Sequence, residues 1–218
     1  YVSTQRGFAD VYLMDVASGK TERVIDGQQS PDFESLFLLR PGLAWSPTGS
    51  HLAIVAKKHG KNALFIFDVV EREVEREYVF DLDAIFTPTW SPDGERMAMV
   101  GLMDGWSDIY VVALEDGALT RLTHDPYDER DPDWSPAGAL LAFSSDRRTT
   151  DLEYDDSTAF DYGPYNLYTV DVDTRAVTQM TDHAAKDEYA AWSPDGSQLL
   201  FVSERSGVGN MYLLDAEG

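Results

Sequence analysis

A short phrase built on Trp-Ser-Pro occurs four times in this chain and limits the folds that the chain can adopt. The copies begin at Trp45, Trp90, Trp134 and Trp192, and each reaches a glycine four residues later. Successive copies are 45, 44 and 58 residues apart, a period typical of stacked or radially repeated units. The chain is therefore predicted to consist of repeated structural units.

Each copy of the phrase is followed by short apolar runs with turn residues between them. One run carries an aromatic residue at a fixed position of the repeat, at Phe65, Tyr110, Tyr168 and Tyr212. Four such runs per period, bounded by Gly, Pro, Asp or Asn, predict four antiparallel strands rather than helices. Four-stranded sheets repeated at this period are the blades of a β-propeller. The expected fold class is therefore all-β.

The repeated phrase also predicts the turn between the first two strands of each blade. Proline presets φ for the first turn position, and glycine adopts the positive φ that closes a tight hairpin. The tryptophan ends the first strand, where a ring of this size can bury about 150–250 Å² between neighbouring sheets. We expect all four tryptophans to occupy equivalent buried positions.

The string Trp-Ser-Pro-Asp-Gly, followed by an apolar strand, an Asn/Asp-apolar-Tyr strand and an Arg-Leu-Thr strand, resembles the TolB-type propeller repeat, a relative of the WD repeat. The resemblance covers essentially the whole chain. It implies a non-catalytic scaffold that binds a protein, peptide or ligand, in a periplasmic or secreted location and with an envelope protein as one partner. The same repeat occurs in accessory propellers of prolyl-oligopeptidase-like peptidases and in glycan lyases, which is the alternative function.

Both ends of the chain fall inside a repeat. Residues 1–3 match a second strand, and the residues after Asn210 match a third strand. We expect one TolB-like domain over residues 1–218, belonging to a longer propeller of about six blades. A five-bladed ring with irregular closure is the alternative. The expected blades are three full ones at about 43–80, 87–124 and 131–182 and two partial ones at about 1–26 and 189–218.

The net charge of −22 argues against whole classes of partner. Nucleic acids and anionic membrane surfaces bind basic faces, so we expect neither as a partner. No apolar run approaches the roughly 20 residues of a membrane span, and the absence of cysteine excludes disulfides and thiolate metal sites. An acidic surface can simply keep a protein soluble, or it can be a halophilic adaptation in which concentrated salt screens the repulsion.

The links from the fourth strand of one blade to the first strand of the next run toward the central channel of a propeller. Charged and aromatic residues recur in these links, and their convergence predicts a binding site at the channel mouth. The candidate residues are Arg40, Phe86, Asp128, Glu129, Arg130, Asp131, Glu188 and Tyr189. A calcium site among the carboxylates from Asp125 to Asp133 is an alternative that lacks the specific EF-hand loop pattern.

The third full blade contains extra residues between Arg147 and Asn166, placed between its second and third strands. Aromatic residues within the insertion make it unlike a disordered spacer. It either packs on the edge of its own blade or contacts a partner. The candidate contact residues are Tyr154, Phe160, Tyr162 and Tyr165.

No catalytic signature is present. The chain lacks the G-x-S-x-G, H-E-x-x-H, G-x-x-x-x-G-K-[ST] and G-x-G-x-x-G patterns. Of the four histidines, His124 and His183 follow the fourth strand in successive blades and are interpreted as turn residues rather than metal ligands. We therefore predict no catalytic residue and no cofactor, and the sequence identifies no metal site.

Overall fold

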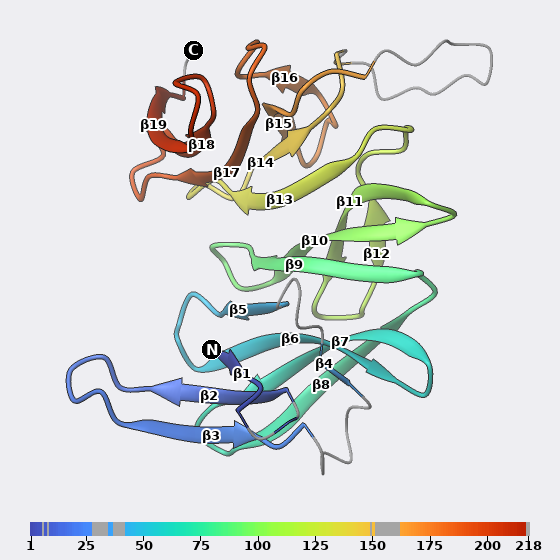
Figure 1. The fold of residues 1–218 in the computed structure, drawn as a ribbon. Coiled ribbons are helices and arrows are strands. Elements are labelled where there is room, and N and C mark those ends of the chain that lie inside the picture. The colour runs from blue at the N-terminus through green and yellow to red at the C-terminus, as the bar shows by residue number, and fades with distance from the viewer. Residues whose placement is uncertain are drawn as a thin grey trace. The chain divides into compact units, whose positions relative to one another are not determined.

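The computed structural model describes residues 1–5, 7, 9–27, 35–36, 42–148, 150 and 162–216, and within these ranges every regular element is a β-strand (Figure 1). The chain forms two compact units, residues 1–88 and residues 89–218. Each unit consists of antiparallel sheets whose strands follow one another in chain order. The all-β fold class predicted from the repeat is confirmed.

The first unit holds one partial blade and one full blade. The partial blade is a three-stranded sheet of β1 (Val2–Ser3), β2 (Asp10–Met14) and β3 (Thr21–Ile25). The full blade contains β5 (Leu43–Trp45), β6 (His51–Lys58), β7 (Lys61–Asp68) and β8 (Glu73–Phe80), and the two-residue strand β4 (Ser35–Leu36) pairs with the far end of β6. Val11, Ile54 and Phe65 belong to a shared core between these sheets.

Three further sheets follow along the chain. The first contains β9 (Ala84–Trp90), which runs through the boundary between the units, with β10 (Arg96–Met103), β11 (Trp106–Ala113) and β12 (Leu119–Arg121). The second contains β13 (Glu129–Trp134), β14 (Leu140–Ser145), β15 (Asn166–Asp171) and β16 (Val177–Gln179). The last is the partial blade of β17 (Asp187–Trp192), β18 (Gln198–Ser203) and β19 (Asn210–Asp215).

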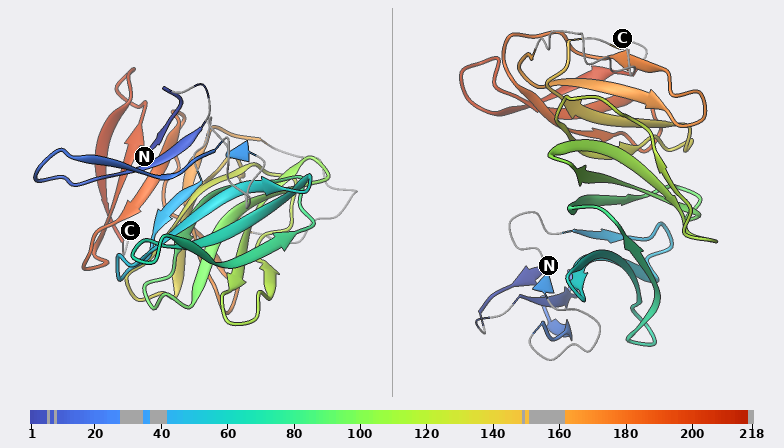
Figure 2. Two further views of the ribbon diagram at one scale, coloured as in Figure 1. Left: turned by 90° about the horizontal axis from the view of Figure 1, so that it is seen from below. Right: turned by 90° about the vertical axis from the view of Figure 1, so that its right-hand side faces the viewer.

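Neighbouring sheets of the second unit share their cores. In Figures 1 and 2, β17 runs beside β14 and β15. Ala142 and Leu167 from the earlier sheet pack with Ala190 and Phe201 from the later one. In the same unit β10 and β11 lie against β13, so these two four-stranded sheets each complete their core with the first strand of the sheet that follows.

The turn predicted from the repeated phrase is present in all four copies. Gly49, Gly94, Gly138 and Gly196 have φ between +72° and +75°. Each glycine N–H donates a hydrogen bond of 2.8–2.9 Å to the carbonyl of the serine in its own phrase. Glycine is favoured here because a side chain at positive φ is strained.

An Asp/Asn position at the start of the third strand fixes the link that leads to the next blade. Asn62 donates hydrogen bonds to the carbonyls of Leu82 (2.8 Å) and Asp83 (2.9 Å). The Asn166 amide oxygen accepts a hydrogen bond of 2.9 Å from the His183 N–H. Because these links lead directly into β9 and β17, the same contacts hold the first strands of the following blades.

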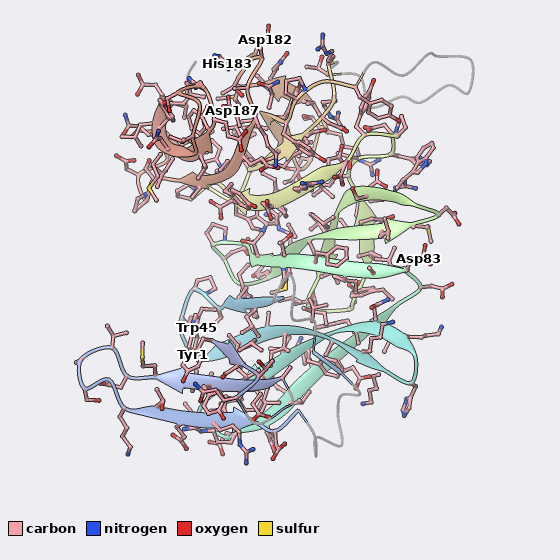
Figure 3. The ribbon with its side chains drawn as sticks, in the orientation of Figure 1. Tyr1, Trp45, Asp83, Asp182, His183 and Asp187 are labelled. Carbon is pink, nitrogen blue, oxygen red and sulfur yellow. The ribbon has the colours of Figure 1, made fainter. Side chains whose placement is uncertain are left out.

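The tryptophans are not equivalent, contrary to the expectation from sequence. Trp134 is 5% exposed, its indole N–H donates to the Thr89 carbonyl (3.2 Å), and the Arg96 guanidinium lies 4.8 Å from its ring. Trp45, which Figure 3 labels, is 51% exposed. The reason is that the sheet before Trp45, β1–β3, has no counterpart of β9, the strand that supplies Thr89 to Trp134.

Candidate functional site

The first strands β13 and β17 are distorted at the same place. Their pairing with β14 and β18 shifts between Arg130 and Asp133 and between Glu188 and Ala191. Within these irregularities Asp131 has φ +51° and Tyr189 has φ +59°. Bulges re-aim side chains at the ends of strands, and non-glycine residues at positive φ are strained and gather at functional sites. The distortion therefore marks this end of the sheets as a candidate site.

Five side chains meet beside these bulges, and we call them the Arg130 cluster: Asp128, Arg130, Tyr165, Lys186 and Glu188. Arg130 Nε donates to Asp128 Oδ2 (2.7 Å), and Arg130 Nη1 donates to Glu188 Oε1 (3.4 Å). The Arg130 guanidinium lies 4.3 Å from the Tyr165 ring centre, and the Tyr165 hydroxyl donates to Asp128. Lys186 Nζ lies 2.6 Å from Glu188 Oε2. Two regions that the sequence singled out separately thus meet here.

The charges of the Arg130 cluster are stabilised where they stand. Burial alone would raise the pKa of Asp128, but hydrogen bonds from Ser107 and Tyr165 and the Arg130 charge outweigh it, so the pKa lies below its usual value. Burial raises the pKa of Tyr165, and its hydrogen bond to Asp128 raises it further. Tyr165 is thus a protonated donor rather than a base. The cluster suits electrostatic recognition better than proton transfer.

The other candidate residues differ in their accessibility. Tyr189 is 60% exposed, and the exposed Tyr162 packs edge-to-face against Tyr127 at 5.7 Å between ring centres. Glu129 is fully buried, so it supports the site from within. Asp131 is half-buried, and Phe86 is half-buried in the 1–88 unit. Arg40, Tyr154 and Phe160 lie outside the described residues.

Arg147 organises a buried network that sequence reasoning missed. Its guanidinium donates to Asp125 Oδ2 (2.7 Å) and to Glu129 Oε1, and it is fully buried. The Tyr168 hydroxyl donates to the Arg147 carbonyl (2.6 Å). Burial raises the pKa of both Asp125 and Glu129, against the opposing charge of Arg147. The network fixes the start of β13, from which Arg130 projects.

A signal for this network was present in the repeat. The sequence Ser145-Asp-Arg147 at the end of one second strand returns as Ser203-Glu-Arg205 at the end of the next. Both arginines contact the serine two residues earlier and the acidic residue that begins the first strand of their sheet. Arg205 donates to Ser203 Oγ (2.8 Å) and to Asp187 Oδ2 (2.8 Å). Asp187 begins β17 as Glu129 begins β13. The recurrence of an arginine at the end of the second strand, together with an acidic residue at the start of the first, predicts an ion pair in these two blades.

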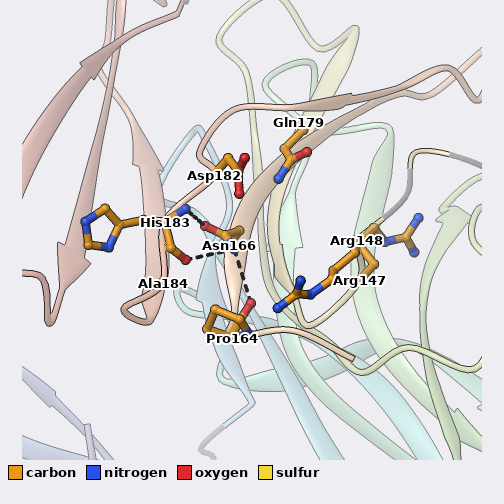
Figure 4. Close-up of a pocket in the computed structure, with 8 residues that line it drawn as sticks. All are labelled: Arg147, Arg148, Pro164, Asn166, Gln179, Asp182, His183 and Ala184. Carbon is orange, nitrogen blue, oxygen red and sulfur yellow. Dashed lines mark hydrogen bonds between the residues drawn. The ribbon is translucent and has the colours of Figure 1, made fainter. Parts of the chain in front are cut away.

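A polar pocket of 510 Å³ opens at the same end of the sheet, where Glu129, Ser145 and Asn166 are neighbours in adjacent strands. Figure 4 shows its lining. The buried Arg147 Nη1 has no hydrogen-bond partner among the described residues. Its lining consists of Arg147, Arg148, Pro164, Asn166, Gln179, Asp182, His183 and Ala184.

His183 has the turn role expected from sequence. Its Nδ1 accepts a hydrogen bond of 2.9 Å from the Ala185 N–H.

The carboxylates considered for calcium are committed to separate partners: Asp125 to Arg147, Asp128 to Arg130, and Asp133 to the Trp192 N–H (2.8 Å). Those contacts account for these carboxylates without a cation.

Comparison with known proteins agrees with this architecture. The family model of the TolB beta propeller domain matches residues 34–159. An uncharacterized protein of Agrobacterium fabrum is 31% identical over 75% of this chain and 50% of its own length. A protein described as the uncharacterized peptidase YuxL, of Bacillus subtilis, is 30% identical over 52% of this chain and 21% of its own length. The chain thus spans half or less of these relatives.

A solved structure shares the fold. The crystal structure of TolB from Acinetobacter baumannii matches with a TM-score of 0.72 and 19% identity, over 100% of this chain and 49% of that one. Among the described residues, no helix has the length and hydropathy of a membrane span. The repeated phrase, the blades and the matched family model together show that this chain belongs to the TolB β-propeller domain family.

Proposed function

We propose that this chain is a non-catalytic binding scaffold whose contact face comprises the Arg130 cluster and the exposed ring of Tyr189. The observation that carries the proposal is the arrangement of Asp128, Arg130 and Glu188 beside Tyr165 at the ends of strands. Side chains fixed on strand ends by packing and ion pairs bind with little loss of conformational entropy.

The charges at this face favour a cationic segment of a protein or peptide. The cluster sets the carboxylates of Asp128 and Glu188 against the cations of Arg130 and Lys186. The half-buried Asp146, whose carboxyl group accepts the Asp128 N–H (2.9 Å), adds a third carboxyl group beside them. The chain as a whole carries −22, so a basic partner is also drawn in at long range. Tyr189 adds an exposed aromatic surface, the type of residue that dominates binding energy at interfaces.

The cellular setting follows from the family resemblance. We propose a periplasmic or secreted location with an envelope protein as partner, by analogy with TolB. The second candidate is an accessory propeller of a larger peptidase, favoured by the similarity to the uncharacterized peptidase YuxL. Both place recognition rather than catalysis on this segment.

A peptide-binding measurement tests the proposed face. Fluorescence anisotropy with a panel of Lys/Arg-rich peptides and neutral peptides of equal length would compare the wild type with Tyr189→Ala and Arg130→Gln. Arg175→Gln is the matched control, because Arg175 is exposed in the turn between β15 and β16, at the opposite end of the same sheet. We expect preference for basic peptides, with affinity lowered about tenfold by Tyr189→Ala and unchanged by Arg175→Gln.

Two results would contradict the proposal. If the wild type and the three variants bound every peptide equally well, the binding site would not be on this face. Turnover of peptide or polyuronate substrates that persists through repurification would replace the scaffold with an enzyme.

A further inference from the structure

A histidine and two carboxylates from three neighbouring strands converge in the 1–88 unit. His51 begins β6 and is directly opposite Asp68 at the end of β7, and Glu75 lies on β8. His51 Nε2 is 2.8 Å from Glu75 Oε2 and 3.7 Å from Asp68 Oδ2. All three donor atoms lie within 4.8 Å of one another. We propose that this triad binds a divalent transition-metal ion, with Zn²⁺ as the best match.

Glu75 reaches the triad from a β-bulge. Arg76 pairs with Ile66 and Val74 pairs with Phe67, so Glu75 is the extra residue on β8. A residue in a bulge is released from the regular ladder, and bulges occur preferentially where a side chain must be re-aimed. The sheet therefore departs from regular pairing at the residue that completes the triad.

The remaining atoms of two triad members are held from outside the triad. His51 Nδ1 shares a hydrogen bond of 2.8 Å with Ser50 Oγ. Asp68 Oδ1 accepts the N–H groups of Val70 (2.7 Å) and Glu71 (2.8 Å). These hydrogen bonds orient both side chains so that each presents one donor atom, as hydrogen bonds to metal-binding residues commonly do.

The donor set and its spacing fit zinc. One imidazole nitrogen and two carboxylate oxygens, with a position left for water, is a common zinc arrangement, whereas calcium and magnesium favour oxygen ligands alone. Bond lengths of about 2.0–2.2 Å place tetrahedral donors roughly 3.4 Å apart. The observed 2.8 Å and 3.7 Å bracket that value, and the Asp68 and Glu75 oxygens lie within 4.8 Å of each other. Side-chain shifts of up to about 1.4 Å therefore admit the ion.

Such an ion would cross-link β6, β7 and β8 at one end of these strands. The acidity of the chain favours any cation, but only the triad supplies a nitrogen ligand together with two oxygens within 4.8 Å among the described residues. The triad involves no residue of the Arg130 cluster, so this site is independent of the proposed binding face.

Isothermal titration calorimetry with ZnCl₂ on the chelator-treated 218-residue chain tests the site. We expect one equivalent to bind in the wild type. Glu75→Gln and His51→Ala should each lower the affinity at least about tenfold. Glu73→Gln is the matched control. Glu73 is on β8, as Glu75 is, and pairs with Asp68 on β7, but it is not a member of the triad. Glu73→Gln removes the same charge as Glu75→Gln and should leave the affinity for zinc within about twofold of the wild-type value.

The same proteins without metal report whether the substitutions disturb the fold, through the temperature of thermal unfolding. The Glu75 side chain is 46% exposed, so Glu75→Gln should unfold near the wild-type temperature and lose only the increase caused by zinc. Absence of saturable zinc binding, or equal binding by the wild type and Glu75→Gln, would overturn the site and leave the triad as an ion pair of His51.

Discussion

The sheet β13–β16 and the sheet β17–β19 carry the same repeat, but equivalent residues are buried in the first and exposed in the second. Leu167 on β15 is fully buried, whereas Met211, which occupies the same position on β19, is 75% exposed. Thr169 and Leu213 differ in the same way. The face of β14 and β15 packs against β17, but no described strand covers the corresponding face of β18 and β19.

The arginines of the two sheets show the same difference. Arg147 is completely buried between Asp125 and Glu129, whereas Arg205 is about one third exposed and pairs with Asp187 alone. The two arginines also share their contacts with the local serine and aromatic rings. How much a residue of the repeat contributes to stability therefore depends on whether a neighbouring blade covers it. This is expected for repeat proteins, which are stabilised by contacts between adjacent repeats.

The largest expected effect separates two tryptophans of the repeated phrase. Trp134→Ala should lower the free energy of unfolding by about 3–5 kcal/mol, because it empties a packed position between sheets. Trp45→Ala should lower it by less than about 1 kcal/mol, because half of the ring is already exposed. Urea unfolding followed by circular dichroism measures both. Equal losses would show that the phrase stabilises each blade independently of its neighbour.

A pair of aliphatic substitutions sharpens the comparison between the two sheets. Leu167→Ala should lower the free energy of unfolding by about 2–5 kcal/mol, since it leaves a cavity against β17. Met211→Ala should change it by no more than about 0.5 kcal/mol. The same urea titration provides the measurement. A large loss from Met211→Ala would mean that β19 is covered in solution, for example by a second copy of the chain.

A smaller effect concerns pH. Burial raises the pKa of Asp108 to about 6, despite its ion pair with Arg121. The folded state thus holds this proton more tightly than the unfolded chain, so stability falls as pH rises from about 4 through about 6. Asn166 occupies the equivalent position in the sheet β13–β16 without a charge.

Asp108→Asn should therefore flatten the dependence of unfolding free energy on pH. Relative to the wild type, the variant should gain at most about 3 kcal/mol between pH 4 and pH 7. Parallel denaturant titrations at several pH values give this difference. A constant difference between the two proteins across that range would show that Asp108 titrates normally.

The features that the sequence predicts well are local. The Ser-Pro-x-Gly turn follows from the fixed φ of proline and the positive φ of glycine, and the strands follow from short apolar runs between such turns. The exposure of Trp45 was not expected, although the repeat register already indicated its cause. Residues 1–3 match a second strand, so the preceding sheet contains no first strand among the described residues.

The candidate site was predictable only in part. The repeat register indicated that the starts of β13 and β17 are neighbours, which brought Arg130 and Glu188 together. The insertion between Arg147 and Asn166 has no counterpart in the other copies, so nothing in the repeat placed Tyr165 against Asp128. The sequence analysis did not predict the triad of His51, Asp68 and Glu75. The triad depends on the register between strands and on a bulge in β8, neither of which can be read from composition.

Amide hydrogen exchange of the two equivalent third strands tests most directly whether a blade is stabilised by the blade beside it. In the 218-residue chain β15 is covered by β17 on one face and bordered by β16, whereas no described strand covers that face of β19 or borders it in the place of β16. We predict that β15 amides exchange only through opening close to global unfolding, and that β19 amides exchange at least about 100-fold faster. Equal protection of β15 and β19 would contradict this account.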